Sequence, residues 1–320
     1  MKLSIATPPT VLSTTATGEV APIEAATIAL FGWEEAAAAR DTARLQSRGG
    51  DVELHVDVYP AQGEARGSVV FIGGLSNHAL GSADFEFELS KVGWNVVGLD
   101  LRGHARSGGA RGDFTIAQTV SDIADAAAYA RDRFANLPVA VMGSSLGGFY
   151  ALCAANGIEG LAVAVSHWVF LPNEPMSKQD ARMRPVALAL DKFLPKMRLP
   201  TRQVADWSAV AEDPELRQKC FDDPLMTWKY TARSLASGFR YAPATPLTEL
   251  QVPQLVVIGD SDKMTPMPYT RKIYDMLRGD KEWITIPGAG HMGGLVEHQD
   301  EMLAVVDGYL GRRMPVAAAH

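Results

Sequence analysis

The stretch that most constrains this chain is residues 139–148, because it combines a strand, a sharp turn and the start of a helix. Apolar strand residues lead into Gly-Ser-Ser-Leu-Gly (143–147), and helix-compatible residues follow directly. Gly143 and Gly147 lie two positions before and after Ser145, where a strained turn leaves no room for larger side chains. This Gly-x-Ser-x-Gly pattern between a strand and a helix predicts a nucleophile elbow that presents Ser145.

Two other structures fit the same glycine-rich turn. One is an ordinary strand-to-helix connection, and the other is a loop that binds phosphate groups. A phosphate-binding loop ends in Gly-Lys-Ser/Thr, and that ending is missing here. Ser144 competes with Ser145 as the nucleophile, but the two glycines are centred on Ser145. The catalytic interpretation therefore depends on finding a base and an acid elsewhere in the chain.

Short apolar strands alternate with helices along most of the chain, a pattern typical of a mostly parallel, doubly wound sheet covered on both faces. Before them, residues 44–47 and 52–59 flank a Gly-Gly-Asp turn, and the second stretch alternates apolar and polar residues, which predicts an antiparallel pair. The sequence thus predicts an α/β fold. The expected strands of the alternating region are 67–72, 94–100, 139–142, 161–165, 254–259 and 283–286, and the expected helices include 85–92, 115–134 and 269–277.

The alternation is interrupted once, between about residues 167 and 248. This segment holds several prolines and methionines, apolar helical stretches and no clear strand. We therefore expect it to be a mostly helical cap inserted over one end of the sheet. The remaining predicted parts are a core of residues 44–166 and 249–312, an N-terminal extension of residues 1–43 (a loose tail to about residue 20, then a helix) and a C-terminal tail of residues 313–320.

The composition argues against several kinds of partner. The chain has 320 residues and a net charge of −7, with no lysine- or arginine-rich run, which speaks against binding nucleic acid or an anionic membrane surface. No apolar run is long enough to span a bilayer, and no secretion signal is recognisable, so we expect a cytoplasmic protein. Cys153 and Cys220 lack metal-ligand spacing, and we expect no disulfide, metal or organic cofactor. The oligomeric state, monomer or dimer, stays open.

A serine becomes a nucleophile when a histidine accepts its proton and a carboxylate orients that histidine. In a doubly wound sheet such groups come from loops at the carboxyl ends of strands. His291 lies in a loop of this kind, within Gly-Ala-Gly-His-Met-Gly-Gly (288–294), and is the predicted base. His167 also follows a strand, but it leads straight into the cap segment and has no carboxylate loop before it.

Two carboxylates follow the strand at 254–259. Asp262 lies further out on the loop and can turn back toward His291, so we expect it to be the acid. Asp260 is expected to cap the turn through its side chain. The order Ser145, Asp262, His291 is the order of α/β-hydrolases and differs from that of chymotrypsin.

The reaction also needs two backbone N–H groups that bind the developing oxyanion. Leu146, directly after Ser145, is expected to supply one. The other is expected from Leu75, because the glycines of Gly-Gly-Leu (73–75) let the backbone come close. The residues expected to contact substrate are Gly74, His78, Trp168 and Met292, with a plain surface position as the alternative for His78.

Three further polar residues are expected to have no catalytic role. His104 is expected to hold loops together beneath the site. Asp100 is expected to anchor its own loop through hydrogen bonds. His55 lies on the polar side of its strand and is expected at the surface.

The chain resembles the α/β-hydrolases, and within them the monoacylglycerol lipase, lysophospholipase and carboxylesterase group. The resemblance spans roughly residues 45–310, with a weaker likeness in Asp-Pro-Leu (223–225) of the cap segment. Two positions depart from the group: Gly73 stands where a histidine is usual, and Ala105 stands where a second glycine is usual. The stretches that carry the resemblance are Gly-Gly-Leu (73–75) with Asn-His (77–78), Asp100–Ser107, Gly143–Gly147, Gly259–Asp262 and Gly290-His291.

The resemblance implies an α/β-hydrolase fold and a serine ester hydrolase that works through an acyl-enzyme. A cap rich in methionine, leucine and aromatic residues favours small to medium esters with an apolar acyl or aryl group. The same three residues could serve lactone, amide or carbon–carbon bond hydrolysis, or perhydrolysis. A small-molecule receptor without turnover is a further alternative. A haloalkane dehalogenase is disfavoured, because that chemistry needs a carboxylate where Ser145 stands.

Overall fold

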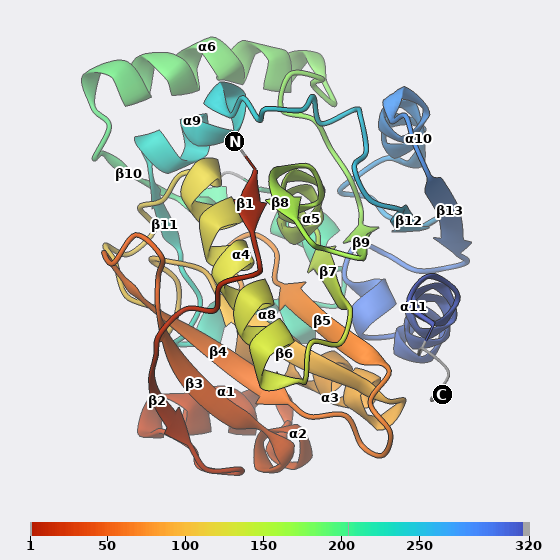
Figure 1. Ribbon diagram of the computed structural model, residues 1–320. Helices are drawn as coiled ribbons and strands as arrows, with labels where there is room; N and C mark the ends of the chain where they lie inside the picture. Colours follow the sequence, from red (N-terminus) through yellow and green to blue (C-terminus); the bar gives the residue numbers. More distant parts are fainter. Residues whose placement is uncertain (1, 204, 316–320) are drawn as a thin grey trace.

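The computed structural model describes residues 2–203 and 205–315 (Figure 1). Its centre is a nine-stranded sheet with the order β13-β12-β9-β7-β5-β6-β4-β3-β2. Neighbours from β13 to β6 pair in parallel, whereas β4, β3 and β2 continue the sheet in antiparallel pairing. The predicted mostly parallel sheet with an antiparallel N-terminal pair is therefore confirmed. The strands are β2 (Val11–Thr15), β3 (Asp41–Gln46), β4 (Glu53–Tyr59), β5 (Gly67–Ile72), β6 (Trp94–Asp100), β7 (Val139–Ser144), β9 (Val163–His167), β12 (Gln254–Gly259) and β13 (Lys281–Ile286).

Helices cover both faces of the sheet, so β5, β6, β7 and β12 are buried along their whole length. One apolar core lies between the sheet and α4 and α5, and contains Ile123 and Phe149. The other lies on the side of α3 and α11, and contains Phe85 and Tyr309. The helical elements around the sheet are η1 (Ala79–Ser82), α3 (Ala83–Lys91), α4 (Ile116–Arg133), α5 (Leu146–Gly157), α10 (Met267–Met276), η3 (Gly293–Leu295) and α11 (Gln299–Arg313).

The N-terminal extension is more ordered than the sequence indicated. It contains the expected helical region, as α1 (Pro22–Phe31) and α2 (Glu34–Ala39). The expected loose tail is wrong, because β1 (Leu3–Ser4) pairs with β8 (Ile158–Glu159) and β2 adds an edge strand to the sheet. All five residues of β2 are exposed, so no apolar alternation marked it as a strand. The boundary expected after residue 43 also falls inside β3.

The C-terminal tail begins later than expected. Helix α11 continues to Arg313, and Met314 is buried in the core on the α3 side. Of the tail predicted at residues 313–320, residues 316–320 lie outside the described part of the chain.

Helices are the main regular structure of the segment between residues 167 and 248 and cover about half of it, and Figure 1 draws two of them, α6 and α9, at the top of the molecule. It also contains a short antiparallel pair that was not expected, β10 with β11. These strands have three residues each, too few to produce a recognisable alternation. Its elements are α6 (Lys178–Phe193), β10 (Arg198–Pro200), η2 (Thr201–Gln203), α7 (Trp207–Val210), α8 (Pro214–Asp222), β11 (Lys229–Thr231) and α9 (Ala232–Arg240).

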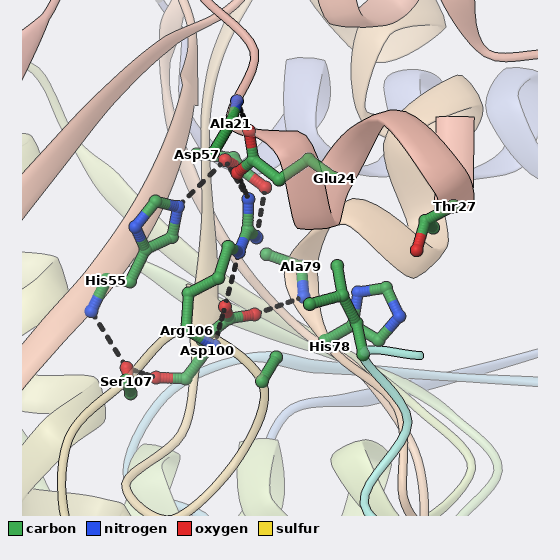
Figure 2. Close-up of polar contacts among 12 residues, drawn as sticks. Ala21, Glu24, Thr27, His55, Asp57, His78, Ala79, Asp100, Arg106 and Ser107 are labelled. Atoms are coloured by element: carbon green, nitrogen blue, oxygen red, sulfur yellow. Dashed lines mark hydrogen bonds and ion pairs between the residues drawn. The ribbon is translucent and has the colours of Figure 1, made fainter. Parts of the chain in front are cut away.

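A cluster of buried charged side chains joins α1 to the sheet and to the loop after β6 (Figure 2). It consists of three carboxylates, Glu24, Asp57 and Asp100, and two guanidinium groups, Arg40 and Arg106. Arg106 lies 2.6 Å from Glu24, 2.6 Å from Asp57 and 2.8 Å from Asp100. Arg40 lies 2.8 Å from Glu24 and also binds Asp57. Removing one partner from such a network typically costs about 3–5 kcal/mol, so these contacts fix the N-terminal helix to the core.

His55 belongs to this ionic cluster, and the surface position expected for it is wrong. Its side chain is buried, and its Nε2–H donates to Asp57 at 3.1 Å. Burial lowers the pKa of His55 and keeps it neutral. Burial opposes the ionisation of Asp57 as well, but Arg106 and Arg40 outweigh that effect and hold its pKa well below the usual range. The polar side of β4 therefore faces buried charges in place of solvent.

Candidate active site

Ser145 occupies the turn between β7 and α5, with φ of 55° and ψ of −122°. A non-glycine residue in this region carries strain on the order of 1–3 kcal/mol, which close packing must hold in place. A Cβ atom at Gly143 would lie 1.9 Å from the carbonyl oxygen of Gly147, and one at Gly147 would lie 2.2 Å from that of Ile72. The two glycines are therefore required by the close approach of the backbone, and the turn presents Ser145 at the carboxyl edge of the sheet.

His291 links Ser145 to Asp262. Its Nε2 lies 2.8 Å from Ser145 Oγ, and its Nδ1 lies 2.8 Å from Asp262 Oδ2. Because an ionised carboxylate only accepts hydrogen bonds, Nδ1 carries the proton and Nε2 accepts from the serine hydroxyl. The three side chains come from the loops after β7, β12 and β13, which meet at one edge of the sheet. This series can pass a proton from Ser145 to His291 and leave the imidazolium facing Asp262.

Asp262 is held in its position by Thr265. The Thr265 N–H donates to Asp262 Oδ1 at 2.8 Å, and the Thr265 hydroxyl donates to Oδ2. Burial raises the pKa of Asp262, but the hydrogen bonds from His291 and Thr265 outweigh burial and leave the pKa below its usual value. Thr265 was not predicted from the sequence, although an aspartate that caps a backbone N–H three residues later is a recognisable turn signal.

Asp260, the other carboxylate of this loop, makes no hydrogen bond or ion pair with His291. Its Oδ1 accepts a hydrogen bond from the Gly288 N–H at 2.7 Å, which joins the loop after β12 to the loop after β13. Of the two carboxylates weighed from the sequence, the structure therefore brings Asp262 to the histidine and gives Asp260 a turn-capping contact.

The backbone of Leu146 directly follows Ser145, and that of Leu75 directly follows Gly74, which packs against Ser145. Leu146 is the first residue of α5, so its N–H has no acceptor within that helix and lies at the positive end of the helix dipole. Gly74 packs so closely that a Cβ there would lie 2.9 Å from Ser145 Cβ, which brings the Leu75 backbone to the same place. Two N–H groups beside a nucleophile can stabilise an oxyanion.

The Leu75 loop is fixed by the residue that follows it. Ser76 has a positive φ of 66°, and its N–H donates to the Tyr230 hydroxyl at 2.9 Å. Tyr230 in turn donates to His104 Nε2 at 2.7 Å, because His104 Nδ1–H is directed to the carbonyl oxygen of Arg102 at 3.0 Å. Burial lowers the pKa of His104 to about 4, so the ring stays neutral. His104 therefore holds loops together beneath the site, and Tyr230 is a supporting residue that sequence reasoning missed.

Ser144 and His167 form a separate buried pair beside the elbow. Ser144 Oγ lies 3.1 Å from His167 Nδ1, and burial lowers the pKa of His167 to about 4. The His167 carbonyl oxygen accepts from the Ser145 N–H at 2.9 Å. Ser144, which competed with Ser145 in the sequence, is thus bonded to a histidine that has no hydrogen-bonded carboxylate among the described residues.

His78 is at neither of the positions expected for it, because it is not at the surface and does not line the cavity that contains Ser145, although its neighbour Asn77 and its partner Asp223 do. It is buried, and its Nε2–H donates to Asp223 Oδ2 at 2.7 Å. The hydroxyl of Thr27, in α1, donates to Asp223 Oδ1 at 2.7 Å. Asp223 is the residue after α8, so these bonds join the N-terminal helix, the loop after β5 and the cap segment. His78 therefore holds chain segments together and makes no contact with the cavity that contains Ser145.

Two adjoining cavities open at the carboxyl edge of the sheet. The catalytic chamber, of about 600 Å³, is lined by Ser145 and His291. The side chamber, of about 450 Å³, is lined mostly by apolar residues, such as Phe149 of α5 and Phe239 of α9, and also by the charged residues Glu174 and Arg184. Leu75 and Leu146 line both chambers. Three residues expected to contact substrate, Gly74, Trp168 and Met292, line the catalytic chamber, where the Trp168 ring lies edge-on to His291 with 6.0 Å between ring centres.

One group of metal-ligating side chains is found in the described residues. Glu24, His55 and Asp57 bring their ligand atoms within 4.8 Å of one another. Both carboxylates are already bound by Arg40 and Arg106, so two guanidinium cations occupy the place that a metal ion would take. This group is better described as part of the ionic cluster than as a metal site.

The fold and the arrangement of Ser145, His291 and Asp262 are those of an α/β-hydrolase of the serine hydrolase class. The chain belongs to the family described as serine aminopeptidase S33, whose model matches residues 63–295. It is 27% identical over 249 residues to a monoacylglycerol lipase of Mycolicibacterium smegmatis, covering 76% of this chain and 87% of the relative. The expected family is therefore confirmed, and the chain is an enzyme.

Solved structures show the same fold at low sequence identity. A monoacylglycerol lipase of Paleococcus ferrophilus has a TM-score of 0.66 and 22% identity, with 81% of this chain and 99% of that chain covered. A carboxyl esterase of Bacillus coagulans has a TM-score of 0.70 and 16% identity, with 86% and 99% covered. Among residues 2–203 and 205–315, no helix combines the length and apolarity needed to cross a bilayer.

Proposed function

We propose that this protein is a serine ester hydrolase, of the carboxylesterase or monoacylglycerol lipase kind, that acts on small to medium apolar esters. The observation that carries the proposal is the position of His291, whose two ring nitrogens each lie 2.8 Å from a partner, Ser145 Oγ and Asp262 Oδ2. A histidine between a hydroxyl and a carboxylate is the arrangement that activates a serine. The similarity to a monoacylglycerol lipase supports ester bonds as the target.

In the first half of the reaction, Ser145 Oγ attacks the ester carbonyl while His291 Nε2 takes the hydroxyl proton. The carbonyl oxygen becomes an oxyanion that accepts hydrogen bonds from the N–H groups of Leu75 and Leu146. Losing one such donor typically costs about 3 kcal/mol of transition-state stabilisation. His291 then gives its proton to the alcohol oxygen, the alcohol leaves, and an acyl-enzyme remains on Ser145.

In the second half, water attacks the acyl-enzyme and His291 acts as the base for that water. Asp262 stays ionised throughout, because its hydrogen bonds hold its pKa below the usual value. It keeps the Nδ1 proton on His291 and stabilises the imidazolium that forms twice in each cycle. The bond between the acyl carbon and Ser145 Oγ breaks, His291 returns the proton to Oγ, and the products are the carboxylic acid and the regenerated hydroxyl of Ser145.

The chambers support an apolar substrate. The lining of the side chamber includes Phe114, Phe149 and Phe170, and the catalytic chamber adds Trp168 and Trp207. Binding sites of this size and apolarity take up most of the surface of a small ligand, and burying each methylene group contributes about 0.8 kcal/mol. Esters with apolar groups should therefore be turned over with higher kcat/KM than esters of small, polar acids.

Two variants test the proposal with p-nitrophenyl butyrate. The Ser145→Ala protein should lose turnover by at least about 10³-fold, because no nucleophile remains. The matched Ser144→Ala protein removes a hydroxyl one position away and should lose far less. Undiminished hydrolysis by the Ser145→Ala protein would show that the nucleophile has been assigned to the wrong residue.

A further inference from the structure

The N-terminal extension reaches the catalytic chamber. Phe31, the last residue of α1, and Trp33, directly before α2, both line it together with Ser145 and His291. Their rings are stacked, with centroids 4.3 Å apart and planes 6° from parallel. Gly32 between them has a φ of 79°, a left-handed conformation that reverses the chain and lets both rings lie side by side. Both residues precede the 63–295 range of the family match.

The extension is held firmly enough to form a wall of a binding site. Glu24, at the start of the α1–α2 segment, is bound by Arg106 in the ionic cluster (Figure 2). Arg40, at the end of the segment, binds Glu24 and Asp57 of the same cluster. Thr27 is bonded to Asp223, and Trp33 packs against the apolar core on the α3 side. A stacked pair on a fixed support loses little side-chain freedom when a ligand binds, which is what a specificity-determining surface requires.

The chemistry of the triad decides which part of an ester reaches this wall. The leaving oxygen must receive its proton from His291 Nε2, so the alcohol group lies on the His291 side of the reacting carbon. The residues after His291, including Met292 and Leu295, line the catalytic chamber together with Phe31 and Trp33. The side chamber lies on the other side of Leu75 and Leu146, and His291 does not line it. The acyl chain therefore belongs in the side chamber, and the alcohol in the catalytic chamber.

We infer that the stacked Phe31–Trp33 pair forms a binding subsite for an apolar alcohol group, so that the preferred esters carry apolar groups on both sides of the ester bond. This inference rests on the proposed ester hydrolysis. Apolar surface that both rings present to the chamber is removed from water when an alkyl or aryl alcohol group fills it. A small polyol would leave that surface uncovered, so an alkyl ester should be preferred over a glyceryl ester of the same acid.

The test measures kcat/KM for butyrate esters of methanol, butanol and octanol, and in parallel for methyl esters of butyric, octanoic and dodecanoic acids. Phe31→Leu and Trp33→Leu proteins keep an apolar residue in the fold and lose the stacked surface, and Phe31→Ala removes the ring altogether. Ile23→Ala is the matched control, because Ile23 lies on α1, is 48% exposed and does not line the catalytic chamber. Thermal unfolding of each variant identifies any that do not fold, and only folded variants enter the comparison.

The expected result is that the ratio of kcat/KM for octyl over methyl butyrate falls on the order of tenfold in the Phe31 and Trp33 variants. The ratio should keep its parent value in Ile23→Ala, and the acyl-chain series should keep its parent slope in all variants. A loss that follows acyl-chain length, or an equal loss for every ester, would overturn the alcohol subsite. Failure of the proposed function is a separate outcome, because it is read from turnover by the Ser145→Ala protein with methyl butyrate.

Discussion

Two of the buried histidine–aspartate pairs in the described residues, His291–Asp262 and His78–Asp223, differ in the surroundings of the second histidine nitrogen. His291 and Asp262 are 2.8 Å apart, and His78 and Asp223 are 2.7 Å apart. Burial raises the pKa of both carboxyls, but the histidine and the other hydrogen-bond donors, such as Thr265 in one pair and Thr27 in the other, together outweigh burial and hold the pKa below its usual value. The second nitrogen of His291 faces Ser145 Oγ, whereas that of His78 is buried without a hydrogen-bond partner among the described residues.

The difference shows that the same two side chains serve chemistry or structure according to their position in the fold. The His291 pair lies on loops at the carboxyl edge of the sheet, beside Ser145 and a chamber of about 600 Å³. The His78 pair joins the loop after β5 to the cap segment, and Thr27 adds α1 to the same carboxylate. Substitutions in the first pair should therefore abolish turnover and leave the stability of the fold unchanged. Substitutions in the second pair should lower that stability and leave turnover nearly unchanged.

The largest difference is expected between the two histidines. His291→Gln should lower kcat for p-nitrophenyl butyrate by at least about 10⁴-fold, because no base remains to activate Ser145. His78→Gln should change kcat by less than about tenfold at 25 °C. Steady-state kinetics on both proteins, with circular dichroism to check the fold, makes the comparison. A folded His78→Gln protein as inactive as His291→Gln would place His78 in the catalytic machinery.

Substitutions of the two carboxylates after β12 should differ nearly as widely in their effect on kcat. Asp262→Asn should reduce kcat about 10³–10⁴-fold, because an amide no longer holds the Nδ1 proton of His291 in place. Asp260→Asn is the matched control, since Asp260 is bonded to the Gly288 N–H and makes no contact with the histidine. It should retain kcat within a few-fold. Reversed losses in the two proteins would assign the acid to Asp260.

The His78–Asp223 pair should contribute to the free energy of unfolding. Asp223 accepts hydrogen bonds from His78, Thr27 and the Leu225 N–H, all in a buried place. Asp223→Asn should lower the free energy of unfolding by about 2–4 kcal/mol, because one acceptor oxygen and the charge are lost together. Asp222→Asn, one residue earlier and exposed, should change it by less than about 0.5 kcal/mol. Urea unfolding measures both values, and equal stability of the two proteins would contradict the structural role.

A smaller effect, on the pH dependence of stability, should come from His104 and His167. Neither has a hydrogen-bonded carboxylate among the described residues. Both have a pKa of about 4 in the folded protein, against about 6.5 in the unfolded chain. The unfolded chain therefore takes up their protons first, and stability present above pH 6.5 is lost as the pH falls toward 4. Each should remove about 2 kcal/mol between pH 6.5 and 5.

This pH dependence is measured by urea unfolding at several pH values. His104→Gln should unfold with a shallower dependence on pH than the parent between pH 6.5 and 5. Asp122, whose pKa burial raises to about 6, acts in the opposite direction but equally in both proteins, so the difference between them belongs to His104. Parallel curves for parent and variant would show that His104 has the same pKa in the folded and the unfolded protein.

The part of the fold that could be predicted from sequence is the part with strong local patterns. Continuous apolar strands and helical spacing predicted the parallel sheet, because a strand buried on both faces must be apolar throughout. Strand β2 was missed because all of its residues are exposed, and β10 and β11 because they have three residues each. In these three strands, pairing with a neighbour determines the structure and leaves little trace in the residues themselves.

Some residues of the candidate site could likewise be predicted from the sequence, and others could not. Ser145, Asp262 and His291 could be proposed from sequence because each follows a strand in a fixed order and the glycines restrict the turn. The position of His78 could not be predicted, because its partner Asp223 is 145 residues away in the sequence. A buried histidine also has the same local sequence as one that lines a pocket. Phe31 and Trp33 were missed for a related reason, since nothing in an alanine-rich helix indicates which cavity its end will reach.

The most direct test of the account is to find which residue a fluorophosphonate modifies. The reagent reacts with a serine whose hydroxyl is activated by a histidine, so peptide mass spectrometry should place a single adduct on Ser145 and none on Ser144. The labelling rate should fall by orders of magnitude in His291→Gln and stay within a few-fold of the parent in His78→Gln. An adduct at another residue, or equal labelling of parent and His291→Gln, would contradict the central claim that His291 activates Ser145.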